Sequence, residues 1–452
     1  MPPHPSAAWL KRAETLTGPA YKRLAQALEA AIAEGELQAG DQLPAQREVA
    51  RLVGIDFTTV TRAYAMARER GLIEGAAGRG TFVRSRTDEG ETGLVDLSMN
   101  LPPQPMGLSL GGLLRETTGA VLARSDPAVL MAYHPGAGSL AQRTAGAAWL
   151  APTLGEVSPE RVRLCGGAQT ALSALLGLLA KPGDVILVEA LTYPGLLAAA
   201  AQRGLRPIPC PMDAEGLEPD ALARLCAEHR PRAICCTPTF QNPTTATMSL
   251  ARRAAIIAVA QAAGAPILED DAYGLLPATP LPALASLWPQ GVFHIATTAK
   301  TLSPGLRIAF IVAPEARVAQ TVDALHAIAQ MPAPLMAAVV TAWIREGDAA
   351  RVLQGVRREA VARRRLAAEI LPSAIGGAES LHVWLDLPSG WSDGRWLEAA
   401  RARGLSMVDA KAFTAPGASR NGARLSLGAP AKAATLARAL REVAGLLAAG
   451  PA

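Results

Sequence analysis

Aromatic residues and cysteines are scarce in this chain. Only 4% of its 452 residues are aromatic, and five are cysteine. A chain of this length needs no disulfide framework, and the spacing of the cysteines matches no metal site. We therefore expect no bound metal and reduced, mostly buried thiols at Cys165, Cys210, Cys226, Cys235 and Cys236.

A long apolar run is also missing. A membrane-spanning helix needs ~20 consecutive apolar residues, and the best stretch, Ala171–Ala180, is ended by Lys181-Pro182-Gly183. The first residues lack the pattern of a signal peptide. These absences predict a cytoplasmic protein with no membrane partner.

Apolar residues and basic charge are plentiful. With 50% hydrophobic residues the chain can bury a large core, and its length predicts two to four domains. The formal net charge is +5. Much of this excess lies in residues Gln42–Arg86, where eight arginines stand against four acidic residues. Such a region is typical of a protein that binds a phosphate backbone, although an ordinary solvated surface has the same composition.

The N-terminal region has the pattern of a small helical domain. Apolar residues recur there at helical spacing in three segments, and a hairpin pattern follows. The expected elements are helix Ala20–Ala33, helix Pro44–Val53, a helix capped by Asp56 or Thr58 that ends near Arg70, and a hairpin of Leu72–Glu74 with Thr81–Val83. Three helices followed by a hairpin predict a winged helix-turn-helix.

The stretch Tyr21–Arg84 resembles the GntR-type winged helix along its whole length. The similarity rests on Leu43-Pro44-x-x-Arg47, Thr59-Val60-x-Arg62-Ala63-Tyr64 and Gly78-x-Gly80-Thr81-Phe82-Val83. It implies that the partner is a double-stranded DNA operator, with the third helix in the major groove and the glycine-rich wing close to the minor groove.

The resemblance also assigns residues to the DNA interface. Arg62 can present a bidentate fork to guanine or bind a phosphate, and Arg47 would hold the backbone. The alternative is that both arginines form ordinary surface ion pairs. The implied DNA-binding residues are Arg47, Thr58, Thr59, Arg62, Gly78 and Gly80.

A polar segment separates this domain from a larger one. Ser85–Gly93 lacks aromatic residues and predicts a linker, so we expect domains at 1–86 and 94–452 joined by 87–93. The second part exceeds one core of ~250–300 residues, which predicts a smaller C-terminal subdomain at about 331–452. Apolar strands there alternate with Ala/Leu-rich helices, which indicates an α/β fold with a mainly parallel sheet. The expected strands are Val185–Val188, Ala233–Thr237, Pro266–Leu268, Phe293–Ala296 and Ile308–Val312.

From about Val95 onward the chain resembles the fold-type I aminotransferases. The strongest match is TTAKTLSPGLRIAF, which is similar to the family's S-x-x-K-x-x-x-P-G-x-R motif. The resemblance implies pyridoxal 5'-phosphate (PLP) as cofactor, with Lys300 as the catalytic lysine that forms the Schiff base. Arg307 and Thr297 would bind the cofactor phosphate. The alternative for Lys300 is an ordinary surface lysine.

Four further segments carry cofactor positions of the same family. CGGAQT places Gly167, Ala168 and Gln169 at a helix N-terminus that can bind phosphate. The resemblance assigns ring stacking to Tyr193 and donation to the cofactor oxygen O3′ to Asn242 and Tyr273. It assigns the pyridine nitrogen to Asp270, whose carboxylate would keep that nitrogen protonated. Asp271 stays open as the alternative acid.

Two more positions follow from the resemblance. Arg424, in NGARLSLG, matches the arginine that clamps a substrate carboxylate, and a surface arginine is the alternative. Tyr133 matches a tyrosine that reaches the phosphate of the partner subunit, which implies a homodimer. Ala296, Ala299, Ala309, His134 and Ala141 depart from the commonest family pattern without removing a cofactor contact.

A GntR winged helix fused to an aminotransferase-like domain is the MocR arrangement. The resemblance therefore implies a PLP-dependent transcriptional regulator that senses a small amino compound, or PLP itself, through an aldimine on Lys300. An active aminotransferase with an accessory DNA-binding domain is the alternative function. A scaffold that has lost its cofactor is the third possibility, and the intact site residues argue against it.

Overall fold

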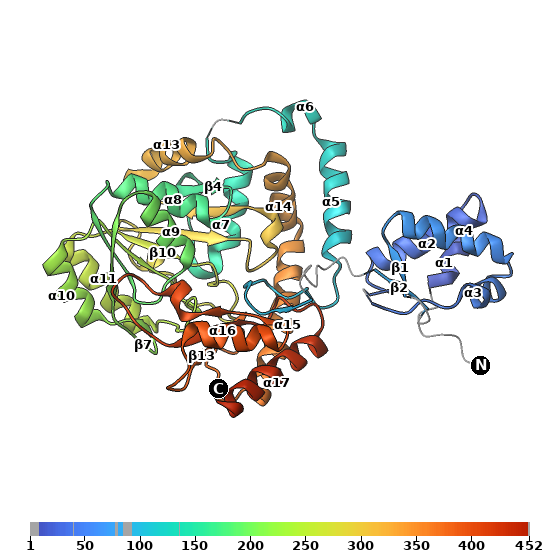
Figure 1. The fold of residues 1–452 in the computed structure, drawn as a ribbon. Helices are drawn as coiled ribbons and strands as arrows, with labels where there is room; N and C mark the ends of the chain where they lie inside the picture. The colour runs from blue at the N-terminus through green and yellow to red at the C-terminus, as the bar shows by residue number, and fades with distance from the viewer. Residues whose placement is uncertain (1–8, 39, 77–79, 85–92, 135, 451–452) are drawn as a thin grey trace. The chain divides into compact units, whose positions relative to one another are not determined.

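The computed structural model of the 452-residue chain describes residues 9–38, 40–76, 80–84, 93–134 and 136–450. The predicted linker and Gly78 therefore lie outside the described residues, apart from Gly93. The chain divides into two compact units, residues 1–93 with 107–116 and residues 94–106 with 117–452 (Figure 1). Among the described residues, no helix is long and apolar enough to cross a membrane.

The N-terminal unit is a winged helix-turn-helix, as predicted. Its apolar core is formed by the helices and closed by an antiparallel hairpin. The elements are α1 (Arg12–Thr15), α2 (Ala20–Ala33), α3 (Gln46–Val53), α4 (Phe57–Glu69), β1 (Ile73–Ala76) and β2 (Gly80–Val83). The prediction that the second helix starts at Pro44 is wrong, because α3 begins at Gln46 and its N-cap is Ala45, so Pro44 lies before the helix. Its carbonyl accepts a hydrogen bond of 2.9 Å from the buried Tyr64 hydroxyl.

The N-terminal unit also includes a segment that the sequence pattern did not reveal. Trp9, Leu10 and Ala13 are buried in the same core, and Trp9 is fully shielded from solvent. The apolar residues of this segment cover little more than one helical turn, which is too short for a periodic signal.

A seven-stranded sheet forms the centre of the larger unit. Its order is β4-β12-β11-β10-β9-β5-β6, and only β12 runs antiparallel to its neighbours, which agrees with the expected mainly parallel sheet. The strands are β4 (Val162–Cys165), β5 (Val185–Glu189), β6 (Arg206–Cys210), β9 (Ala233–Cys236), β10 (Ile267–Asp270), β11 (Val292–Thr297) and β12 (Ala309–Val312).

The sequence pattern missed both edge strands and part of β10. Strand β6 contains Pro207 and Pro209, and proline is tolerated only at the edge of a sheet, where β6 lies. Strand β10 begins at Ile267 and continues to Asp270, beyond the expected Pro266–Leu268. The extension was not predicted because acidic residues are unusual in a buried strand, and Glu269 and Asp270 form the end of β10. Glu269 is nevertheless buried, because it accepts hydrogen bonds from the N-terminus of α12.

Helices cover both faces of the sheet (Figure 1). Phe293 and Ile295 point toward α8, whereas His294 lies on the opposite face with Glu269. The helices of the first face are α8 (Ala168–Leu179), α9 (Pro194–Gln202) and α13 (Val318–Ile328). Those of the second face are α7 (Leu140–Leu154), α10 (Pro219–His229), α11 (Leu250–Ala263) and α12 (Leu284–Leu287). All five cysteines are free and buried, as expected.

A second core lies in the C-terminal part of the larger unit. It is built on a three-stranded antiparallel sheet in the order β13-β16-β15. Strand β3 (Val95–Asp96) pairs with β14 there, and Leu97 is buried in this core, so the residues directly after the predicted linker belong to it. The other elements are β13 (His382–Asp386), β14 (Leu405–Ser406), β15 (Val408–Asp409), β16 (Gly422–Ser426), α15 (Asp348–Ile370), α16 (Asp393–Ala402) and α17 (Ala433–Ala449).

A few elements lie outside these two cores. Helix α14 packs against α7, and β7 pairs with β8. Their bounds, with those of two further helices, are α5 (Leu110–Arg124), α6 (Pro127–Leu130), α14 (Pro334–Glu346), β7 (Met212–Asp213) and β8 (Gly216–Leu217). The domain boundaries 1–86, 87–93, 94–452 and about 331 stay predictions.

Candidate functional site

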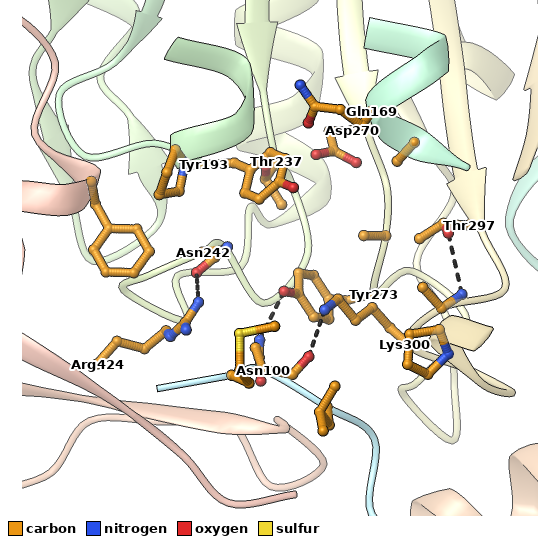
Figure 2. Close-up of a pocket in the computed structure, with 18 of the residues that line it drawn as sticks. Asn100, Gln169, Tyr193, Thr237, Asn242, Asp270, Tyr273, Thr297, Lys300 and Arg424 are labelled. Atoms are coloured by element: carbon orange, nitrogen blue, oxygen red, sulfur yellow. Dashed lines mark hydrogen bonds between the residues drawn. The ribbon is translucent and has the colours of Figure 1, made fainter. Parts of the chain in front are cut away.

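The carboxyl ends of the parallel strands meet at one edge of the large sheet, the place where α/β proteins bind ligands. A cavity of about 430 Å³ lies there (Figure 2). Of the twelve residues that the sequence assigned to cofactor and effector, all but Gly167 and Tyr133 line it. They are Ala168, Gln169, Tyr193, Asn242, Asp270, Tyr273, Thr297, Lys300, Arg307 and Arg424.

Lys300 follows the end of β11 and extends its amine into the cavity. Its Nζ donates a hydrogen bond of 2.5 Å to the backbone carbonyl of Asn100. Burial and the nearby cation of Arg424 lower the pKa of Lys300 from 10.5 to about 8, against the opposing effect of Asp270. A buried lysine of this kind is a better nucleophile at neutral pH than a surface lysine, because more of it is unprotonated.

Asp270 ends β10 and is the acid that faces the cavity. Its Oδ1 is buried and has no hydrogen-bond partner among the described residues. Burial, reinforced by the charge of Asp271, raises the pKa of Asp270 to about 7. Asp271 does not line the cavity and lies 3.9 Å from His294 Nε2. Of the two acids, only Asp270 is placed to meet a cationic ring nitrogen, which would satisfy its free oxygen.

Arg424, on β16, is held at the opposite side of the cavity. It donates a hydrogen bond of 3.0 Å to Asn242 Oδ1 and another to the backbone carbonyl of Ser98. Its guanidinium lies 4.9 Å from the centre of the Phe413 ring. Because Asn242 accepts through its oxygen, its amide N–H groups remain as donors to a ligand. Arg424 is therefore a buried cation that is held in place by Asn242 and the Ser98 carbonyl.

The remaining end of the cavity has the features of a phosphate site. Gly167 is the N-cap of α8 with a φ of 103° and no side-chain cap, which leaves the first N–H groups of the helix for a ligand. A Cβ at Gly167 would come within 2.9 Å of Arg307 Nη2. Arg307 is exposed, and the Thr297 hydroxyl accepts a 3.2 Å hydrogen bond from Ala299 N–H. This combination of helix end, guanidinium and hydroxyl fits a phosphate dianion.

Two tyrosines complete the wall of the cavity. Tyr193 is the N-cap of α9, and burial raises its pKa. Tyr273 is buried, and its hydroxyl accepts a hydrogen bond of 2.9 Å from the Asn100 amide (Figure 2). Ser98 and Asn100 also line the cavity, and no sequence motif pointed to them. Their contacts to Arg424 and Lys300 use backbone carbonyls, for which no residue type is diagnostic.

Tyr133, like Gly167, does not line the cavity, and it lies in a different place. It is 80% exposed and lies beside His134, His326 and Gln330. A role at the cofactor phosphate would require a second subunit.

The predicted DNA-binding residues that the structure describes, which exclude Gly78, lie on α3, α4 and β2 of the N-terminal unit. Asp56 is the N-cap of α4 and accepts hydrogen bonds from both the amide and the hydroxyl of Thr58. Arg62 is exposed, with its guanidinium 4.7 Å from the centre of the Tyr21 ring. Arg47 is exposed as well.

The other interface residues are less accessible or lie on the hairpin. Thr59 is half-buried, and Gly80 has a φ of 116° that favours glycine. The exposed guanidinium of Arg62 on the recognition helix is available for a groove contact, whereas the Thr58 hydroxyl is already used in the cap.

Family models match both parts of the chain. Residues 20–83 match the bacterial regulatory proteins of the gntR family, and residues 93–443 match aminotransferase class I and II. The HTH-type transcriptional regulator YdeF of Bacillus subtilis is 28% identical over 90% of this chain and 89% of its own length. The 2-aminoadipate transaminase of Thermus thermophilus is 31% identical over 68% of this chain and 79% of its own length.

A solved aminotransferase structure is similar to this chain in fold. LysN, an α-aminoadipate aminotransferase from Thermus thermophilus in complex with N-(5'-phosphopyridoxyl)-L-leucine, superposes with a TM-score of 0.73 at 26% identity. The match covers 86% of this chain and 98% of that chain. The large sheet and the second core are thus arranged as in an aminotransferase.

Proposed function

This chain belongs to the aminotransferase class I and II family and is a transcriptional regulator of the MocR-type GntR arrangement, and from that premise we propose that it binds PLP on Lys300 and senses an amino compound there. The observation that carries the proposal is the convergence of Lys300, the unpartnered Asp270 oxygen and the Gly167–Arg307 phosphate site on one cavity. The winged helix-turn-helix would bind a double-stranded DNA operator in the cytoplasm.

Each end of the cavity matches one part of PLP. The helix end at Gly167, with Arg307 and Thr297, would hold the phosphate, and Asp270 would hold the ring nitrogen in its protonated form. Tyr193 would stack on the ring. PLP, when bound, supplies an aldehyde that condenses with the Lys300 amine, forming a C=N bond and releasing water.

Arg424 suggests the class of effector. A buried guanidinium with donors directed into a cavity selects a carboxylate, so the proposed effector is an amino acid or another amino compound with an acidic group, and PLP itself is the other candidate. The amine of the effector would take the place of Lys300 on the cofactor and free the lysine side chain. Lys300 would then lose its bond to the cofactor, and Arg424 would bind the acidic group of the effector.

The segment around Ser98 and Asn100, which contacts both cations, supports the proposal that the cavity is coupled to the DNA-binding unit. Ser98 and Asn100 contact Arg424 and Lys300 through backbone carbonyls, and they follow the predicted linker by fewer than ten residues. A ligand that competes for either cation therefore changes the contacts of this segment. An effector shifts the regulator only by its different affinity for the two states that result.

We also propose that the protein acts as a homodimer. Tyr133 is exposed on the chain and would reach the cofactor phosphate of the partner subunit. The two winged helices of the dimer would then contact two half-sites of the operator. The spacing of these half-sites would match the distance between the two winged helices.

The experiment is reduction of the PLP-loaded protein with borohydride, followed by peptide mapping, together with DNA binding measured with a panel of amino acids. We expect the reduced adduct on Lys300 and a change in DNA affinity with the correct amine. Lys300→Ala and Arg424→Ala should abolish that change and retain basal DNA binding. An adduct on another lysine contradicts the site. Rapid amino-group transfer without any effect on DNA binding would instead establish the aminotransferase alternative, which the 31% identity to a transaminase favours.

A further inference from the structure

Asn100 lies at the centre of a buried hydrogen-bond chain that ends at the cofactor side of Tyr273. Its Nδ2 is 2.9 Å from Tyr273 Oη and 3.0 Å from His382 Nδ1. His382 Nε2 lies 3.1 Å from the backbone carbonyl of Gln241. Asn100, Tyr273 and His382 are all buried, and none of them belongs to the motif around Lys300.

The chemistry of these groups fixes the direction of every hydrogen bond. A carbonyl only accepts, so His382 Nε2 carries the proton that it donates to Gln241. Burial, together with the nearby cation of Arg424, lowers the pKa of His382 to about 3. The ring is therefore neutral at physiological pH, and its Nδ1 is an acceptor. The Asn100 amide must then present its NH2 group to His382, because a flipped amide would leave two acceptors facing each other.

The same amide group determines the state of Tyr273. One N–H of Asn100 serves His382 and the other serves Tyr273, so the Tyr273 oxygen accepts. Among the described residues this is the one hydrogen bond made by the Tyr273 hydroxyl. Its own proton is thus directed away from Asn100, toward the cavity that Tyr273 lines.

We propose that Asn100, held by neutral His382, is a positioning residue that keeps the Tyr273 hydroxyl as a donor toward O3′ of bound PLP. This inference rests on the proposed function, because it requires PLP in the cavity. The other charged or titratable groups that face Tyr273 are Arg424, Asp270 and Tyr193. None of the three makes a hydrogen bond with the Tyr273 hydroxyl among the described residues, so Asn100 alone sets its direction.

The consequence is measurable in the absorbance of the cofactor linked to Lys300. The linking nitrogen is the atom of Lys300 that joins the cofactor. When this nitrogen loses its proton, its positive charge no longer neutralises the negative charge on the cofactor oxygen O3′. A hydroxyl donor at O3′ stabilises that form and lowers the pKa of the nitrogen. Without the Asn100 amide, His382 Nδ1 becomes a competing acceptor for the Tyr273 proton. We therefore expect the pKa of the bound cofactor to rise by about 1 pH unit in Asn100→Ala.

The test is a spectrophotometric pH titration of the PLP-loaded protein in a double-mutant cycle. Asn100→Ala should raise the pKa, Tyr273→Phe should raise it at least as much, and Asn100→Ala should add nothing in the Tyr273→Phe background. Gln202→Ala, at the exposed end of α9, is the control and should leave the titration unchanged. Asn100→Leu has a similar shape and offers no N–H and no charge, so it should give the same rise if Asn100→Ala does not fold.

Several outcomes would overturn the inference. They are an unchanged pKa in Asn100→Ala or Asn100→Leu, and a rise from Asn100→Ala that persists in the Tyr273→Phe background. A wild-type protein without a lysine-linked cofactor band would instead refute the proposed function itself. The two failures are therefore distinguishable in one series of spectra.

Discussion

The rate at which the apo-protein attaches PLP should depend on pH in a way that reports the Lys300 environment. Only the neutral amine attacks an aldehyde. With the pKa of Lys300 at about 8, about one-tenth of the amine is neutral at pH 7, whereas an ordinary lysine with a pKa of 10.5 has about one part in 3,000. Burial and Arg424 thus increase the reactive fraction about 300-fold.

The assay is stopped-flow absorbance of PLP mixed with apo-protein between pH 6 and pH 10. The rate should rise about tenfold from pH 6 to pH 7 and level off above about pH 8, where Lys300 is mostly neutral. Arg424→Gln removes the cation that lowers the pKa of Lys300. In this variant the plateau should begin at higher pH, and attachment at pH 7 should be slower.

The matched control is Arg420→Gln, four residues earlier on the same segment. Arg420 is paired with Asp386 at 3.0 Å and does not line the cavity. Its replacement should leave the pH at which the plateau begins unchanged. A wild-type rate that still rises tenfold per pH unit up to pH 10 would show that Lys300 has an ordinary pKa, and the argument from burial and Arg424 would fail.

Three further predictions concern other parts of the chain. Gly167→Ala should weaken PLP binding by about tenfold in equilibrium titration, because the φ of 103° disfavours a side chain and the new Cβ would meet Arg307. Arg62→Ala should cost ~1–3 kcal/mol of operator affinity in gel-shift assays if Arg62 contacts a guanine, and a uniform loss on all sequences would make it a backbone contact. Tyr64→Phe should lower the free energy of unfolding of the N-terminal unit by about 1 kcal/mol in denaturant melts, because the Pro44 carbonyl loses its buried donor.

Much of the cavity could be predicted because its residues follow strand ends. Asp270 ends β10, and Thr297 ends β11 shortly before Lys300, so a parallel sheet necessarily brings them to the same edge. Arg424 lies in a separate core, and only the family motif connected it with the cavity. Asn242 was likewise placed by resemblance, and its contact with Arg424 gives that placement a physical reason.

The parts that could not be predicted depend on contacts between distant segments. Asn100 reaches Lys300 across 200 positions and Tyr273 across 173. Neither contact produces a local pattern, because one uses a backbone carbonyl and the other depends on the tautomer of His382. The burial of Trp9 could not be predicted for a similar reason, since it follows from tertiary packing and not from helical periodicity.

The short segment after the predicted linker connects the proposed cofactor site with the proposed regulation. Strand β3 fixes the segment in the C-terminal core, the Ser98 and Asn100 carbonyls hold Arg424 and Lys300, and the Asn100 side chain orients Tyr273. A cofactor that engages the lysine and an effector that engages the arginine therefore act on the same few residues. In the sequence, those residues follow the predicted linker directly. If the cavity binds PLP and an effector as proposed, any exchange of partners at Lys300 or Arg424 would alter the contacts of this segment and so report which ligand is bound.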